Sequence, residues 1–279
     1  MIRLIWLELL KIAARPRSYI GFAVIFIFCT LVQFALYADG MEYIQFVTQN
    51  VEQSFVFEGK ILNGSLVCFV ILQALILQIP LLVALVTGDL ISGEAAMGTL
   101  RLWLTRPASR ASILFSKFFA GQLYTFLILV WLGILALGVS LLIFGQGDLI
   151  VLKTDELVII PANDVLWRFF AALAMAFLAL SLVGALSMLL SCYSDNSIGP
   201  IITTMAIIIL FTIIGSLDVP LFERIRPYLF TTHMNAWRSF FEEPIPWEQI
   251  RDSAIFVFGH IIVFLGIGLF HFNRKDILT

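Results

Sequence analysis

Residues 166–190 read LWRFFAALAMAFLALSLVGALSMLL, and this stretch decides the class of fold. Its one charged side chain, Arg168, lies near the beginning. A helix needs about 20 predominantly apolar residues to cross the hydrocarbon core of a bilayer. The stretch is therefore predicted to be a transmembrane helix. Its small residues favour close approach of neighbouring helices in lipid; they are Ala172, Ala176, Ser181, Gly184, Ala185 and Ser187.

Five further apolar stretches flank this one along the chain. They cover residues 19–37, 61–87, 118–144, 198–217 and 254–272. The second and third of the six stretches are long enough to tilt or bend, and Pro80 is a candidate kink point. With 61% hydrophobic and 13% charged residues, the chain is neither a soluble domain nor a disordered one. We predict an all-α polytopic membrane protein with six transmembrane helices in one domain, residues 1–279.

The positions of lysine and arginine predict the orientation. With the N-terminus in the cytoplasm, the inner segments carry ten Lys and Arg residues and the outer segments seven. Because cytoplasmic loops carry an excess of these residues, both termini are expected in the cytoplasm. The formal net charge of −2 argues against a nucleic-acid partner.

The segment between the second and third spans is the most informative one. Residues 88–117 read GDLISGEAAMGTLRLWLTRPASRASILFSK. Met97, Leu100 and Leu104 recur at helical spacing, while Glu94 and Arg101 fall on the other face. The pattern predicts an amphipathic helix at the cytoplasmic interface that ends at Pro107. Such a helix can simply connect two spans, or it can be a docking surface for a cytoplasmic protein.

This segment resembles the signature of permease subunits of the type-two (ABC-2) export family of ABC transporters. The resemblance rests on Gly93-Glu94, Gly98-Thr99-Leu100, Leu104-Thr105-Arg106-Pro107, Ser109-Arg110 and Lys117. The six spans, the basic amphipathic N-terminal stretch and the tail at 272–277 are similar to that family as well. The chain departs from the pattern where the family has a second acidic residue, because Ala95, Ala96 and Met97 stand there.

The resemblance implies that residues 88–117 contain a coupling helix, which receives motion from a separate ATPase chain. It implies a set of residues at the ATPase-coupling interface: Glu94, Gly98, Thr99, Arg101, Arg106, Pro107 and Arg110. Each of these can equally be an ordinary interfacial residue. ATP and Mg would be bound by the partner ATPase, and this chain would hold no cofactor. The expected partners are ABC ATPase subunits and a second permease chain, identical or paralogous, in a bacterial inner membrane.

Two other segments are predicted to lie at the membrane surface. Residues 1–16 form an amphipathic pattern that Pro16 ends, which indicates an interfacial helix before the first span. Residues 218–253 combine four prolines with many aromatic residues, which predicts short helices or a re-entrant hairpin at the outer interface. The candidate outer-interface aromatics are Tyr228, Trp237, Phe240 and Trp247.

Several classes of function are disfavoured by what the sequence lacks. It contains no G-x-x-x-x-G-K-[ST] motif, so ATP hydrolysis is expected on another chain and an enzyme is not expected. Cys29, Cys68 and Cys192 stand in apolar runs and are expected to be small core residues, not metal ligands. The interiors of the spans hold no Asp, Glu or Lys, which disfavours an ion pump.

Three functions remain open at this point. The first is ATP-driven export of a hydrophobic or amphiphilic substrate. The second is a mechanical relay from the ATPase to a periplasmic partner, without a cargo. The third is a membrane scaffold or channel unrelated to ABC transporters.

Overall fold

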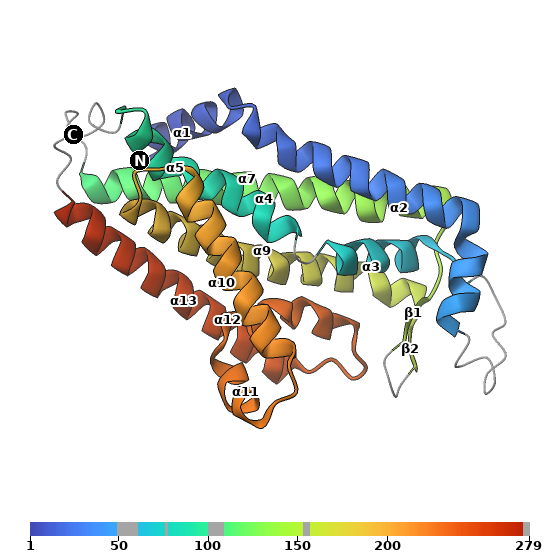
Figure 1. Ribbon diagram of the computed structural model, residues 1–279. Helices are drawn as coiled ribbons and strands as arrows, with labels where there is room; N and C mark the ends of the chain where they lie inside the picture. Colours follow the sequence, from blue (N-terminus) through green and yellow to red (C-terminus); the bar gives the residue numbers. More distant parts are fainter. Residues whose placement is uncertain (49–60, 76–77, 100–108, 153–156, 276–279) are drawn as a thin grey trace.

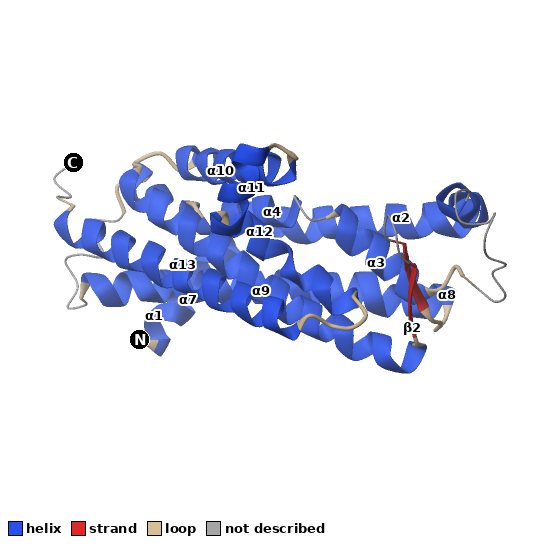
Figure 2. Cartoon of the chain, turned by 90° about the horizontal axis from the view of Figure 1, so that it is seen from below, coloured by secondary structure: helices blue, strands red, loops and turns tan. Residues whose placement is uncertain are grey.

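The computed structural model describes the chain except for residues 49–60, 76–77, 100–108, 153–156 and 276–279. The described part is predominantly helical (Figures 1 and 2). Within it, five helices are long and apolar enough to cross a membrane, and a bent helix pair adds a sixth if it is counted as one span. The prediction of a helical, multi-pass membrane protein is confirmed at that level.

The spans coincide with the predicted apolar stretches. The five long helices or helical runs are α2 (Arg17–Thr48), the run of α7 (Arg110–Gly133), η1 (Ile134–Val139) and α8 (Ser140–Phe144), α9 (Ala162–Tyr193), α10 (Ile198–Ser216) and α13 (Trp247–Arg274). In α2 the membrane-length part is Arg17–Gly40, and the helix is kinked at Asp39. The third span begins eight residues earlier than predicted, because Ser109 caps α7 by accepting a hydrogen bond from the Ser112 N–H.

The second predicted span consists of two helices that meet at an angle of 57°. They are α3 (Gly64–Ala74) and α4 (Gln78–Thr87), and Pro80 lies in the first turn of α4. Proline has no N–H for the helical ladder and its ring excludes the carbonyl four residues earlier. A helix can therefore begin just before Pro80, but it cannot run straight through it.

Helix α9 lies at the centre of the bundle (Figure 1). It contacts α4, α5 (Asp89–Ala96), α7, α10, α13 and η3 (Asn235–Phe241). Small residues on α9 permit this packing, and Gly184 faces Gln122 of α7 so closely that an added Cβ would lie 2.9 Å from the Gln122 Nε2. The many large apolar side chains on the outer faces of α2, α7, α10 and α13 stay exposed, as expected where lipid is the solvent.

A short β-hairpin between α8 and α9 was not predicted. Strands β1 (Leu149–Leu152) and β2 (Leu157–Ile160) pair antiparallel, with Leu149 opposite Ile160. Both strands are rich in the β-branched residues that favour a pleated surface, and Leu149 and Ile160 are buried. The two strands together have only eight residues, and the longer apolar runs on both sides dominate the sequence pattern.

Four short helices join α10 to α13, as predicted for residues 218–253. They are α11 (Pro220–Ile225), η2 (Arg226–Tyr228), α12 (Phe230–Met234) and η3. Arg168 of α9 holds this segment, because its guanidinium lies 2.7 Å from Glu243 Oε2 and donates to the carbonyls of Phe240 and Glu242. The N-terminus, α5 and the end of α13 lie at one end of the bundle, and the β-hairpin lies at the other (Figure 1).

Candidate functional site: a buried charge cluster at the chain-terminal end

Seven charged side chains meet where α1 (Ile2–Ala14), the start of α2, α5 and α7 come together. We call this set the charge cluster: Glu8, Lys11, Arg15, Arg17, Asp89, Glu94 and Lys117. The three acidic side chains are buried, and the Lys117 side chain is 0% exposed. Charges of this kind are rarely fully buried unless they are paired.

Four members of the cluster form a closed ring of ion pairs. Lys11 Nζ lies 2.7 Å from an oxygen of Glu8 and 2.7 Å from Glu94 Oε1. Lys117 Nζ lies 2.9 Å from Glu8 Oε2 and 2.8 Å from Glu94 Oε1. Each ammonium therefore bridges the same two carboxylates, and the ring ties α1, α5 and α7 to one another.

The electrostatics of the ring keep Glu94 ionised. Burial raises the pKa of its carboxyl group, but the charges and hydrogen bonds of Lys117 and Lys11 outweigh burial and hold the pKa below its ordinary value. Glu94 is therefore a carboxylate at neutral pH, and the ring is held by full charges. Removing one charge of the ring leaves its partners as buried charges without a counter-charge. The resulting loss of stability exceeds the net contribution of the intact ion pair.

Asp89 forms the second half of the cluster. It is hydrogen-bonded to Arg15 Nη1, and its Oδ1 lies 2.8 Å from Arg17 Nη1. These arginines flank the junction between α1 and α2, so Asp89 fixes α5 against that junction. Gly93 provides the space for this carboxylate, because a Cβ at position 93 would lie 2.6 Å from Asp89 Cγ.

We expect Gly93→Ala to lower the free energy of unfolding by about 1–3 kcal/mol, the usual cost of overpacking a filled site. Asp89 is short and held by two arginines, so its carboxylate cannot rotate away without losing them. The measurement is thermal unfolding in detergent. The control is Gly259→Ala, because a Cβ at position 259 meets nothing within 4 Å. Equal stabilities of the two variants would contradict the crowding of Asp89.

Serines of α9 fix the other side of α5. Ser191 Oγ accepts hydrogen bonds from the backbone N–H groups of Ser92, at 2.8 Å, and Ile91, at 3.3 Å. Thr87 and Ser187 share a hydrogen bond of 2.5 Å between their hydroxyls. Ser191 of α9 thus provides a hydrogen-bond acceptor for N–H groups in the first turn of α5.

The first part of the predicted amphipathic helix is described by the structure, and residues 100–108 of it lie outside the described residues. Helix α5 ends at Ala96, and Gly98 takes a φ of 68°, which is left-handed and favours glycine. The Thr99 N–H closes the turn by donating to the carbonyl of Glu94 at 3.0 Å. Gly98 therefore ends α5, which helical periodicity did not reveal. Arg101, Arg106 and Pro107 lie outside the described residues.

Two predicted interface residues have partners within the chain. Glu94 is buried in the ring, so its carboxylate is not a surface group in this structure. Arg110 donates hydrogen bonds from Nη1 to the carbonyls of Phe272, Asn273 and Lys275, at 2.8, 3.1 and 2.8 Å. Arg110 thereby satisfies carbonyls at and just after the end of α13 and connects that helix to the start of α7.

The N-terminal helix is present as predicted, but its polar face points inward. Glu8 is buried, whereas Ile2 and Trp6 are exposed. In water the reverse would be expected. An inward polar face fits a helix whose outer side meets the apolar part of a bilayer and whose inner side meets the charge cluster.

The predicted outer-interface aromatics separate into two kinds. Tyr228 and Trp247 are exposed, and Trp247 stacks on Trp167 at 6.2 Å between ring centroids. Trp237 and Phe240 are buried among α9 and η3. Cys29, Cys68 and Cys192 are buried free thiols, as expected of core residues.

Sequence reasoning missed the ring because its members are far apart in the chain. Lys11 and Glu94 are separated by 83 positions, and Glu8 and Lys117 by 109. The available signal was that all seven charges fall in the segments assigned to one side of the membrane. This grouping predicts that the seven charges lie near the same membrane surface, but it does not predict which charges form ion pairs.

A search of the curated proteins finds no match to this chain. Residues 22–278 match the family model described as "Protein of unknown function (DUF2705)". The match covers most of the bundle, from α2 to the end of α13. The chain therefore belongs to the DUF2705 family.

Proposed function

We propose that this protein is the membrane-spanning subunit of an ATP-driven ABC transporter, and that it exports a hydrophobic or amphiphilic substrate. In this proposal residues 88–117 are the coupling segment, both chain ends are cytoplasmic, and the membrane is a bacterial inner membrane. ATP and Mg belong to a separate ATPase chain, and a second permease chain, identical or paralogous, completes the complex. The motif resemblance and the excess of positive charge around α5 support this assignment.

The observation that carries the proposal is the attachment of α5 to the transmembrane helices. The Gly93-Glu94 part of the motif is not a free surface loop, because Glu94 is ion-paired with α1 and α7 and Asp89 with the start of α2. Force applied to the surface next to α5 would be transmitted directly to three helices. It would reach α2 through Asp89, α7 through Glu94 and α9 through Ser191. A two-state tilt of these helices is the type of transition that ATPase dimerisation can bias.

In this proposal Glu94 acts as a positioning residue. Its role is to hold α5 on α1 and α7, whereas direct contact with the ATPase falls to the exposed part of the segment. Met97 at the end of α5 is exposed. Arg101 and Arg106 follow it in the sequence and are the basic residues that we assign to this contact.

We expect a stoichiometric ABC ATPase to co-purify with the tagged chain in mild detergent. Arg101→Ala with Arg106→Ala should reduce its recovery at least tenfold, because an interface contact to an acidic partner is lost. Arg224→Ala is the control, since Arg224 is exposed on α11 and lies far from α5 in the sequence. Mass spectrometry of the purified complex gives the stoichiometry and shows whether the second permease chain is identical.

Recovery of the chain without an ATPase in several detergents would overturn the proposal and favour the scaffold or channel. An ATPase together with a bound periplasmic protein and no transported substrate would instead support the mechanical relay. Reporter fusions test the orientation in the same strains: position 195 should report cytoplasm and position 240 periplasm. The opposite pattern would place α5 on the side without ATP.

A further inference from the structure

A cavity of about 470 Å³ lies between the helices, away from the charge cluster. Its walls come from α3, α4, α7, α9, α10, α12 and η3, at the level where α3 and α4 diverge. Its volume is within the range of small-molecule sites in proteins. Residues on both sides of the bend line the cavity, with Leu72 and Leu75 before it and Ile79 and Pro80 after it.

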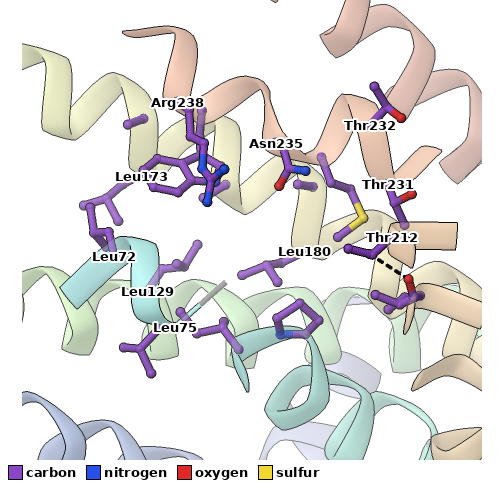
Figure 3. A pocket seen from close by; sticks show the side chains of 18 of the residues that line it. Leu72, Leu75, Leu129, Leu173, Leu180, Thr212, Thr231, Thr232, Asn235 and Arg238 are labelled. Carbon is purple, nitrogen blue, oxygen red and sulfur yellow. Dashed lines mark hydrogen bonds between the residues drawn. The ribbon is translucent and has the colours of Figure 1, made fainter. Parts of the chain in front are cut away.

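The cavity has one apolar side and one polar side. Leucines of the transmembrane helices, including Leu72, Leu75 and Leu129, form the apolar side. Thr231, Asn235 and Arg238 of the α12–η3 segment line the opposite side. Figure 3 shows Arg238 and Asn235 projecting from η3 toward the leucines. A molecule that fills this space meets apolar carbon at one end and polar groups at the other.

Arg238 has no carboxylate partner among the described residues. Its guanidinium lies 5.7 Å from the ring centroid of Trp237, and no described Asp or Glu comes within ion-pair distance. The side chain is exposed, although partial burial of the guanidinium lowers its pKa from the ordinary value, and it stays protonated at neutral pH. A guanidinium without a carboxylate partner on a cavity wall can bind an anion, preferably a planar or tetrahedral oxyanion.

A second polar group in the cavity is also unsatisfied. Thr231 is 5% exposed, and its Oγ1 has no hydrogen-bond partner among the described residues. Buried hydroxyls are normally hydrogen-bonded, so the unpaired Oγ1 is a group that an acceptor oxygen would satisfy. Arg238 and Thr231 together favour a ligand with acceptor oxygens at this side of the cavity.

We propose that this cavity binds a single-chain amphiphile with an anionic headgroup. The headgroup pairs with Arg238 and accepts a hydrogen bond from Thr231, and the alkyl chain lies against the leucines of α3 and α7. This inference rests on the proposed function, whose substrate class it narrows from any amphiphile to an anionic one. The positive charge of Arg238 favours an anionic headgroup, and the leucine side chains favour an alkyl chain.

The test measures binding of radiolabelled dodecyl phosphate to the full chain in phosphatidylcholine nanodiscs, without an ATPase. We expect saturable binding of one molecule per chain. Inorganic phosphate and dodecyltrimethylammonium should each compete at least tenfold more weakly than unlabelled dodecyl phosphate. The first lacks the alkyl chain and the second has the wrong charge.

Variants separate a binding role from a structural one. Arg238→Ala should weaken binding at least tenfold, and Arg238→Lys should restore much of it. Thr231→Val should weaken binding without lowering the unfolding temperature, because the hydroxyl has no partner in the protein. Leu129→Trp should block the apolar side. Arg251→Ala is the control, since Arg251 is exposed on α13 and its ion pair among the described residues is with the exposed Asp252.

Equal binding of the anionic and cationic amphiphiles, or unchanged binding by Arg238→Ala, would overturn the inference. Competition by inorganic phosphate as strong as that by dodecyl phosphate would also overturn it, because the site would then recognise a free anion. Failure of the inference is distinguishable from failure of the proposed function. An ATPase can co-purify with a chain that binds no amphiphile, and a chain without an ATPase can still bind one.

Discussion

Replacing Lys117 with methionine should lower the free energy of unfolding by about 3–5 kcal/mol, the range for breaking a buried ion pair by removing one partner. Lys117 is 0% exposed and bridges Glu8 and Glu94. Methionine is similar in length and apolar, so packing is largely kept while the charge is lost. Two buried carboxylates would then share the single ammonium of Lys11. The measurement is thermal unfolding of the purified chain in detergent or nanodiscs.

Two further variants show whether the effect comes from the ring. Lys117→Met combined with Glu8→Gln should recover part of the lost stability, because the second change removes one uncompensated charge. Lys275→Met is the matched control. Lys275 is ion-paired at 2.7 Å with the exposed Asp195, and pairs of that kind contribute about 0–1 kcal/mol. Equal destabilisation by Lys117→Met and Lys275→Met would show that the buried ion pairs of the ring contribute no more to stability than an exposed pair.

Gly64→Ala should lower the free energy of unfolding by about 3 kcal/mol, the upper part of the range for overpacking. Gly64 is the first residue of α3 and packs on α8. A Cβ at position 64 would lie 2.6 Å from Leu141 Cα and 2.7 Å from the Ser140 carbonyl oxygen. These are backbone atoms, so no side-chain rotation can relieve the contact and the two helices must separate.

The matched control for Gly64→Ala is Gly138→Ala. Gly138 lies in η1 on the same helical run as Leu141, and a Cβ there meets nothing within 4 Å. That variant should leave stability unchanged or raise it slightly, because alanine loses less backbone entropy than glycine on folding. Thermal unfolding and the elution volume in size-exclusion chromatography report both variants. Equal behaviour would show that α3 and α8 are not in backbone contact.

Much of the fold could be predicted from the sequence because one physical constraint dominates it. Apolar runs of membrane length can be recognised locally, and each coincides with a helix or a helix pair. Local signals with a strong steric cause also acted as expected: Pro80 lies just after the break between α3 and α4, and Ser109 begins α7. The β-hairpin was missed because its eight residues carry no turn signal that outweighs the flanking spans.

The candidate site was predictable only in part. The sequence indicated that residues 88–117 were special, and Glu94 does lie at the centre of the charge cluster. It did not show that Glu94 is buried, because burial depends on Glu8, Lys11 and Lys117, which approach only in the folded bundle. The end of α5 at Gly98 could not be predicted either. The apolar residues on both sides of Gly98 keep helical spacing. The helix ends there because the backbone of Gly98 is left-handed, which the spacing of apolar residues does not indicate.

The closed ring has a consequence for biogenesis of the protein in the membrane. Glu8 and Lys117 are 109 positions apart, so the ring cannot close until the ribosome has synthesised the chain into α7. Until then Glu8 and Glu94 have at most Lys11 to compensate them, and α1 cannot take its final place beside the third span. Packing of α1, α5 and α7 around balanced charges therefore waits for Lys117, the second ammonium of the ring.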